Sequence, residues 1–491
     1  MRIVRLKLCC RSRLLLISCE LLLLSLVALV IVSCANNVWL QTIFSYRFRF
    51  HLSFGVESSV DADSPLNNGN RCREIRRRIS SGVLDYAARE NDSELLQLFT
   101  PLFTERPLVV WSADHHGAPV ADLRGIFEPL GVRFIEHTLY MPSRCAVLCT
   151  CDHVGSVKVL NDSSILDPSP QVLEAFWNAY RRDRDMQQVD AFLVTYTIPL
   201  VEVYARFNKS IIMVPALRYE RTLWDDKNRW RALNERIRNL FASPRNVIGA
   251  NNMYDQQYVK YFTGIEPHYI PSFCAYTGER YNPTRSSYLY ARRVNQPVGA
   301  YWTAPLQEQY AHVNATFKLF ELRELYEVFE FADLCAHLGI VYLPYQVSLM
   351  SFFEQFRMDI PLFAPSLELL ARLHSEHHLV YDRTNYYMRK QSGSLIAAHA
   401  SQASTPDPND DLDADSLRHW LSFADFYTLP CVSYFESAEH LVDTLHSMTL
   451  ERLHEISASM HKFNVHSLKT LLRYWRRHLS LIAQYSPHRP H

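Results

Sequence analysis

The stretch RPLVVWSADHHGAPVADLRGIFEPLGVRFIEHT, residues 106–138, decides the fold. Its apolar run 108–111 is continuous and contains adjacent β-branched residues, which is typical of a strand buried on both faces. Residues 121–131 have apolar side chains at helical spacing and end at Gly131. Residues 132–138 return to a strand pattern. The stretch therefore predicts a strand, a helix and a second strand, which is the repeating unit of a parallel sheet.

The same alternation continues along the chain in two series. The first series has predicted strands at 189–196, 210–216, 245–252 and 267–273, with helices at 198–207 and 253–264. The second has predicted strands at 286–292, 340–346 and 360–366, helices at 322–339 and 348–359, a helix end leading into a strand within 424–437, and a long helix to about residue 484. We therefore predict an α/β fold of two tandem, doubly wound, Rossmann-like domains, at 72–280 and 281–491. Residues 391–415, rich in Ser, Ala, Asp and Pro, are predicted to be a mobile loop.

The N-terminus predicts a membrane anchor. Residues 14–35 form an apolar run interrupted only by the charge of Glu20, and five basic residues precede it. A run of this length suffices to cross a bilayer as a helix, and the basic flank keeps the first 13 residues in the cytosol. We therefore expect a type II signal anchor, a stem at 36–71 and a body in the lumen of the Golgi or endoplasmic reticulum. The alternative is a cleaved signal peptide, because Ser33-Cys34-Ala35 resembles a cleavage site.

Two further features agree with a lumenal body. Four tripeptides fit the N-glycosylation pattern, at Asn91, Asn161, Asn208 and Asn314. Seven cysteines follow the predicted anchor, and an odd number in an oxidising compartment predicts at least one thiol outside any intramolecular disulfide; they are Cys72, Cys145, Cys149, Cys151, Cys274, Cys335 and Cys431. The group Cys145, Cys149, Cys151, Asp152 and His153 does not match common zinc spacings, so a disulfide is favoured over a metal there.

Composition and missing motifs exclude several classes of function. Hydrophobic residues are 48% and charged residues 21% of the 491, the balance of a folded globular protein. Lys and Arg total 51, as do Asp and Glu, and this neutrality argues against binding of nucleic acid through phosphate contacts. The chain lacks the phosphate loop of P-loop enzymes, the Rossmann dinucleotide fingerprint and the serine elbow of α/β-hydrolases.

Two clusters of polar residues follow predicted strands, where ligands of open α/β sheets bind. Asp114, His115 and His116 end the first strand, and a carboxylate beside imidazoles suits proton transfer near neutral pH. An ordinary polar loop explains the same residues equally well.

The second cluster follows the strand at 340–346. Ser348 and Ser351 are predicted to cap a helix and to offer donors to a phosphate, and Glu354 to accept from ribose hydroxyls. Tyr345 lies beside them. The alternative is a plain capping box of Ser351 and Glu354.

A short tail, signal anchor, stem and lumenal α/β body resemble a Golgi or endoplasmic-reticulum glycosyltransferase, and two tandem Rossmann-like domains resemble the GT-B fold. The resemblance implies that the C-terminal domain binds a nucleotide-sugar through Ser348, Ser351 and Glu354, with no cofactor and no metal required. It implies transfer of the sugar to a glycan, glycoprotein or glycolipid acceptor over the first domain.

For this reaction, an inverting displacement with a retaining mechanism as the alternative, His116 is our first choice of general base and Asp114 the other candidate. Asp114 is expected to orient the active imidazole, and His115 to point the other way, toward a structural partner. The replacement candidates are Glu220 and Asn251. Basic residues expected to stabilise the leaving diphosphate enter the second domain: Arg285, Arg292 and Arg293. The alternative function is a non-catalytic lumenal or cell-surface protein on the same scaffold.

Overall fold

The computed structural model describes residues 69–138, 157–161, 164–293, 299–313, 315–326, 329–383 and 392–486. The predicted tail and anchor, nearly all of the stem, and the group from Cys145 to His153 lie outside these ranges. Within them, no helix is both long enough and apolar enough to cross a membrane. Residues 68–491 form one compact unit.

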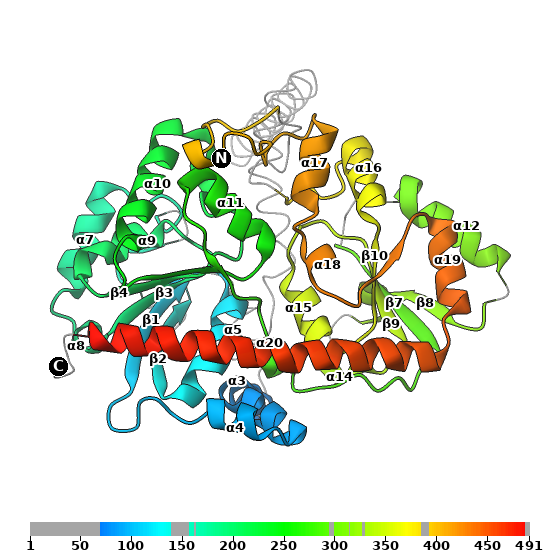
Figure 1. Cartoon of the computed structure of the whole chain (residues 1–491), viewed down its shortest axis with the longest axis horizontal. Coiled ribbons are helices and arrows are strands. Elements are labelled where there is room, and N and C mark those ends of the chain that lie inside the picture. Colours follow the sequence, from blue (N-terminus) through cyan, green and yellow to red (C-terminus); the bar gives the residue numbers. More distant parts are fainter. Residues whose placement is uncertain are drawn as a thin grey trace, which may run out of the picture. The chain divides into compact units, whose positions relative to one another are not determined.

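The first half of this unit is a six-stranded sheet in which every pairing is parallel (Figure 1). Its order is β2-β1-β3-β4-β5-β6, so the chain winds outward in both directions from the middle of the sheet. The strands are β1 (Leu108–Asp114), β2 (Val132–Thr138), β3 (Ala191–Val194), β4 (Ser210–Met213), β5 (Val247–Ala250) and β6 (His268–Tyr269). Every residue of β1 is buried, as its continuous apolar run predicts.

The second half is a five-stranded parallel sheet of order β11-β10-β9-β7-β8. The strands are β7 (Ser287–Ala291), β8 (Lys318–Glu321), β9 (Gly339–Tyr342), β10 (Leu362–Pro365) and β11 (Ser433–Phe435). The predicted α/β class, with two parallel Rossmann-like sheets, is confirmed. The change from one sheet to the other falls between β6 and β7, which brackets the predicted boundary at residue 280.

Helices cover both sheets (Figure 1). Those of the first half are α3 (Gly69–Glu90), α4 (Ser93–Leu98), α5 (Gly117–Phe127), α7 (Pro170–Tyr180), α8 (Arg184–Gln188), α9 (Leu200–Tyr204), α10 (Lys227–Phe241) and α11 (Met253–Thr263). Those of the second are α12 (Ala304–His312), α13 (Leu322–Leu325), α14 (Phe331–Cys335), α15 (Met350–Arg357), α16 (Leu367–His377), α17 (Ala414–Leu421), α18 (Asp425–Thr428), α19 (Ala438–Ser447) and α20 (Leu450–Gln484).

The predicted helix at 322–339 is wrong. The structure has two short helices there, α13 and α14, and the Asp333 carboxylate caps the start of the second by accepting from the backbone N–H of Glu330. The edge strand β8, directly before α13, is absent from the prediction. Three of its four residues are only half-buried and the fourth is exposed, so it has no continuous apolar pattern.

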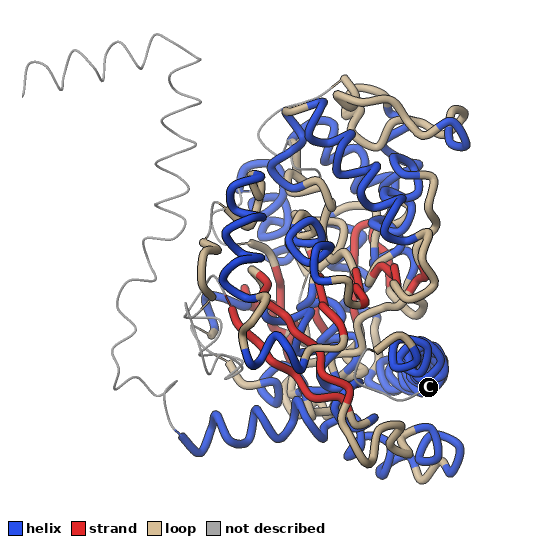
Figure 2. Tube along the Cα trace, turned by 90° about the vertical axis from the view of Figure 1, so that its left-hand side faces the viewer, coloured by secondary structure: helices blue, strands red, loops and turns tan. Residues whose placement is uncertain are grey.

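The long C-terminal helix α20 is confirmed, including its end at Gln484. Its first half packs against α15 of the second domain, while a stripe in its second half is buried against the first domain. That stripe has helical spacing: Leu468, Leu472, Trp475, Leu479 and Ile482. Figure 2 views this helix nearly along its axis, at the C-terminus. α20 therefore ties the two domains together.

The described part of the predicted mobile loop has a 3₁₀ turn at Ala400–Gln402 and a β-bridge between Ser392 and Asp410, is otherwise irregular up to Asp413, and ends in the first residues of α17. It is bonded to α11 of the first domain: the His399 N–H donates to the Tyr261 carbonyl (2.8 Å), and the Asn409 amide donates to the Tyr258 hydroxyl (3.0 Å). Its mobility stays a prediction.

His461 on α20 joins three elements. Its Nδ1 lies 2.9 Å from Asp359 and its Nε2 lies 2.7 Å from Glu90 at the end of α3. Burial lowers the pKa of His461, as does Arg280, but the hydrogen bonds to the two carboxylates outweigh both and raise this pKa overall. The cationic form is therefore favoured in the folded protein.

We expect His461→Gln to destabilise the protein by about 2 kcal/mol at pH 6, since two charge-assisted hydrogen bonds are lost. A raised pKa contributes stability that is present below the unfolded pKa and disappears as the pH rises through the folded pKa. The difference from wild type should therefore shrink between pH 6 and pH 9 in urea unfolding. His466→Gln, at an exposed position of the same helix, is the control and should show no such trend.

Candidate functional site

Asp114, at the end of β1, is a structural residue and not a free base. Its two carboxylate oxygens accept five hydrogen bonds at 2.7–3.0 Å, from the N–H groups of His115, Thr195, Tyr196 and Thr197 and from the Thr195 hydroxyl. The side chain is buried. The carboxylate therefore joins the carboxyl ends of β1 and β3. We expected Asp114 to orient an imidazole, but its hydrogen bonds in the structure go to these backbone groups and to the Thr195 hydroxyl.

His116 is also committed to the backbone. It is the N-cap of α5, where its Nδ1 accepts from the Ala118 N–H at 3.3 Å. In the neutral ring the proton then sits on Nε2, which leaves no nitrogen ready to accept a second proton. We chose His116 as the general base because it lies beyond the end of the strand, and helix capping explains that position.

His115 lies against a side chain that the sequence analysis missed. Its ring stacks on Tyr196 at 5.7 Å, and the Arg221 guanidinium covers the same tyrosine at 4.3 Å. Burial, and then Arg221, lower the pKa of His115 to about 4, while Asp114 acts in the opposite direction. His115 is therefore held neutral at pH 7, and at this pKa it is a weaker base than an ordinary histidine.

The start of α15 differs from the prediction. Its N-cap is Leu349, without a side-chain cap, so Ser351 lies inside the first turn and forms no capping box with Glu354. Ser351 is exposed. Ser348 faces Asp425 of the second domain, and burial raises the pKa of that carboxyl well above its usual range, while Ser348 and the Leu349 N–H partly oppose the rise.

Glu354 faces the segment that leads from the first sheet to the second. Its Oε1 accepts from the Tyr276 hydroxyl at 2.7 Å, within the 3₁₀ turn at Ala275–Thr277. Burial raises the pKa of Tyr276 well above its usual range, and Cys274 and Glu354 add to the rise. The predicted ribose ligand therefore already serves the domain connection.

Substitutions at Glu354 separate these roles. Glu354→Gln retains an acceptor for Tyr276 and should leave the free energy of unfolding within about 1 kcal/mol of wild type, whereas Glu354→Ala should lose about 1–2 kcal/mol. If Glu354 also binds ribose, both variants should lower donor affinity, measured by calorimetry. A loss of stability without a loss of affinity would restrict Glu354 to the domain connection.

The three predicted arginines occupy different places. Arg285 precedes β7 and donates to the Tyr326 hydroxyl. It therefore lies at the amino edge of the second sheet, opposite the carboxyl ends of the strands where a ligand would bind. Arg292 is paired with Glu321 at the end of β8 (2.8 Å). Arg293 reaches the carboxyl edge of the sheet, where it pairs with Asp382 (3.0 Å) and lies 5.0 Å from the Tyr345 ring.

Arg218, also missed, connects the two domains. It follows β4 in the first sheet, and its Nη2 donates to Gln346 after β9 in the second sheet, at 3.1 Å. We call the residues around this contact the domain junction: Tyr196, Arg218, Arg221, Arg293, Tyr345, Gln346, Tyr381 and Asp382. The strand-end rule applied to the strand at 210–216 would have found Arg218. Asp382 follows a helix and carries no such signal.

The replacement candidates are likewise occupied. Glu220 is buried and accepts from the Tyr258 hydroxyl at 2.8 Å. Asn251, at the end of β5, donates to the Ser272 hydroxyl at 3.3 Å. Both side chains hold neighbouring segments in place.

Within the described ranges, one group of side chains has metal-ligand character: His374, His378 and Asp411, whose ligand atoms lie within 4.8 Å of one another. However, His374 Nδ1 accepts from the Val380 N–H (3.1 Å), so its Nε2 carries the proton and donates to Asp411 (3.2 Å). Arg383 pairs with the same carboxylate. These residues fit a hydrogen-bonded network better than a metal.

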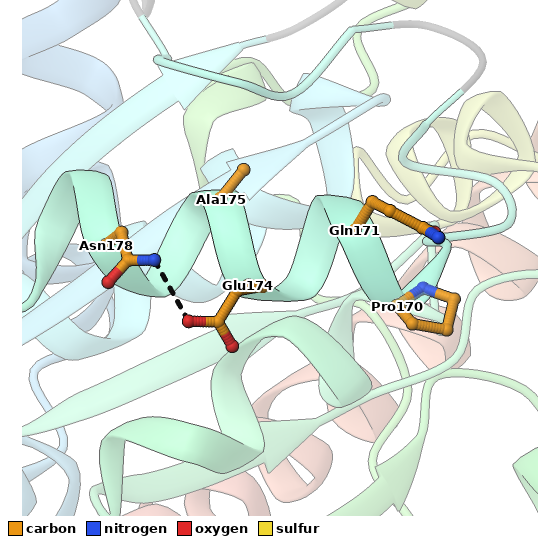
Figure 3. Close-up of a pocket in the computed structure, with 5 residues that line it drawn as sticks. All are labelled: Pro170, Gln171, Glu174, Ala175 and Asn178. Carbon is orange, nitrogen blue, oxygen red and sulfur yellow. Dashed lines mark hydrogen bonds between the residues drawn. The ribbon is translucent and has the colours of Figure 1, made fainter.

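Two hollows lie elsewhere. A volume of about 440 Å³ opens on the exposed face of α7, lined by Pro170, Gln171, Glu174, Ala175 and Asn178 (Figure 3). Its one carboxylate, that of Glu174, forms a salt bridge with Arg206 at 2.7 Å. A void of about 10 Å³ lies between the domains near Phe273, Phe353 and Asn464, large enough for roughly one water molecule.

The predicted glycosylation sites at Asn91, Asn161 and Asn208 are exposed, and Asn314 lies outside the described residues. Cys274, Cys335 and Cys431 are free thiols, which agrees with the expectation of at least one. Use of the glycosylation sites stays a prediction.

Fold and site together define an α/β protein with two parallel Rossmann-like sheets and a polar junction between their strand ends. No family model and no curated protein matches the chain. Among solved structures it is similar to the glycosyltransferase SnogD from Streptomyces nogalater, with 13% sequence identity, a TM-score of 0.40, and coverage of 78% of this chain and 100% of the SnogD chain.

Proposed function

We propose that this protein is a glycosyltransferase that moves a sugar from a nucleotide-sugar to a glycan, glycoprotein or glycolipid acceptor. The observation that supports it most is the contact of Arg218 with Gln346, which brings the carboxyl ends of strands in both sheets to one place. Ligands of open α/β sheets bind at such ends.

In the proposed reaction, the acceptor hydroxyl binds over the first domain and attacks the anomeric carbon of the donor. His115 accepts the proton of that hydroxyl, because its ring is neutral and lies beside the strand ends. Arg293 and the arginines of the first domain stabilise the negative charge that develops on the leaving diphosphate, so no metal is required. Inversion at the anomeric carbon follows from a single displacement.

We further propose the membrane topology that the sequence indicates, with residues 14–35 as a type II anchor and the body in the lumen of the Golgi or endoplasmic reticulum. Protease treatment of intact microsomes should spare the body, and glycosidase should increase its mobility on a gel. A secreted product beginning near Asn36 would contradict the anchor.

One observation favours the second candidate function, a non-catalytic lumenal or cell-surface protein. Asp114 and His116, both predicted to take part in catalysis, serve the fold instead. A scaffold that has lost its chemistry would retain such residues for stability.

A donor screen separates the two functions. The full-length protein, purified in detergent, is heated with a panel of UDP-, GDP- and CMP-sugars. A donor at 100 times its dissociation constant should stabilise the protein by about 2.7 kcal/mol. Stabilisation by one donor, followed by sugar transfer to a glycan mixture, supports the enzyme, and no response to any donor supports the non-catalytic protein.

A further inference from the structure

The domain junction contains a guanidinium that is fully buried and only partly paired. The Arg218 side chain has 0% exposure. Its Nη2 donates to Gln346 (3.1 Å), and its Nε lies 3.4 Å from Asp255. Its Nη1 is buried and has no hydrogen-bond partner among the residues that the structure describes. A buried N–H of a charged group that lacks an acceptor lowers the stability of the folded protein. A ligand that supplied the acceptor would remove this loss of stability.

Arg221 is held nearby in a strained backbone conformation. Its φ of +53° lies in the left-handed region, which a long side chain adopts at a cost of order 1–3 kcal/mol. The strain places the guanidinium 4.3 Å from the Tyr196 ring. Its Nε also lacks a hydrogen-bond partner within the described part of the chain.

The third arginine comes from the other domain. Arg293 pairs with Asp382 at 3.0 Å, and its guanidinium lies 5.0 Å from the Tyr345 ring and 5.5 Å from the Tyr381 ring. The Asp382 carboxylate interacts electrostatically with all three arginines, which therefore converge on one place.

Charged groups of both signs meet at this place. Three guanidinium groups face three carboxyl groups, those of Asp255, Asp382 and Asp425. Burial raises the pKa of all three carboxyls, although Arg218 opposes the rise at Asp255 and Asp425, and the three arginines oppose it at Asp382. The buried Arg218 Nη1 and the Arg221 Nε still lack acceptors among the described residues, and an anion would supply them.

We propose that the diphosphate of a nucleoside diphosphate binds here, between Arg218 and Arg221 of the first domain and Arg293 of the second. The planar guanidinium fork matches phosphate oxygens, and arginines from both domains make the ligand a bridge between them. The inference deepens the proposed function and rests on it for the nucleoside part of the ligand. The proposal differs from the sequence prediction, which placed the phosphate at the start of the helix at 348–351; here the phosphate binds the arginines instead.

Binding at this place would also prepare the base. Burial lowers the pKa of His115 most, and Arg221 adds to the lowering. A diphosphate that neutralises Arg221 should remove the second contribution, raise the pKa of His115 in part and make it a stronger base.

The test is isothermal calorimetry on the full-length protein with inorganic pyrophosphate, UDP and GDP, and with uridine and guanosine as uncharged comparisons. Arg221→Gly removes the guanidinium and suits the left-handed backbone, so it should fold at least as well as wild type. Arg293→Gln tests the second domain, and Arg218→Met the buried position. Arg452→Gln, an exposed α20 residue paired with Glu455, is the matched control for loss of charge.

We expect pyrophosphate and one nucleoside diphosphate to bind, and both Arg221→Gly and Arg293→Gln to weaken binding by about 10- to 150-fold, while Arg452→Gln leaves it unchanged. The His115 pKa, followed by NMR, should rise on addition of pyrophosphate in the wild type and not in Arg221→Gly. Absence of pyrophosphate binding, or equal affinity in all folded variants, would overturn the inference.

The outcomes also separate this inference from the proposed function. If sugar transfer from a nucleotide-sugar does not depend on the three arginines, the proposed glycosyltransferase activity is supported and the proposed diphosphate site is contradicted. Arginine-dependent binding of pyrophosphate without transfer from any nucleotide-sugar would keep the site and contradict the enzyme.

Discussion

Asp114→Ala is expected to destabilise the protein by about 4 kcal/mol or more, the largest effect on stability that we predict. The variant would leave three N–H groups and one hydroxyl of residues 195–197 buried without their acceptor. Each unsatisfied buried donor costs about 1–3 kcal/mol, and a typical protein of this kind is stable by only 5–15 kcal/mol. Urea unfolding followed by circular dichroism measures the loss.

Asp114→Asn should be nearly as harmful, because its amide group would point donors at donors. Asp443→Ala, at an exposed position of α19, is the control and should stay within about 0.5 kcal/mol of wild type. A stable Asp114→Asn protein with slow turnover would restore this carboxylate to a catalytic role.

The second large effect concerns turnover. His115→Gln should lower the rate of sugar transfer by about 10²–10⁴, equivalent to roughly 2.7–5.5 kcal/mol, because a general base contributes an amount of this size. Donor affinity should be nearly unchanged, since the imidazole acts on the acceptor hydroxyl. The measurement is kcat and donor KM with the substrate pair that the donor screen identifies.

His116→Asn is the matched variant next to it. Asparagine is a good N-cap and can retain the bond from the Ala118 N–H, so this protein should fold and turn over much like the wild type. If His116→Asn were the slow variant and His115→Gln the fast one, the roles of the two rings would be exchanged. Full turnover in both would place the base elsewhere.

Much of the fold follows from local patterns in the sequence. The apolar runs of β1, β3 and β4 predicted buried strands, and Gly264 marked the end of α11. These signals depend on side-chain periodicity and capping within about ten residues, so they are visible without the tertiary structure. The helix predicted at 322–339 shows the limit of these signals: its apolar spacing is helical, but the structure has two short helices there.

The sequence by itself determined the α/β class, the two series of strands and the edge of each sheet at which polar groups gather. Only the tertiary structure decided what those groups do. Asp114 finds its partners 81–83 residues away at Thr195–Thr197, and Arg218 meets Gln346 from a distance of 128 residues. The role of a carboxylate or a guanidinium depends on which donors, acceptors and charges surround it once it is buried, and such neighbours are set by the packing of the whole chain.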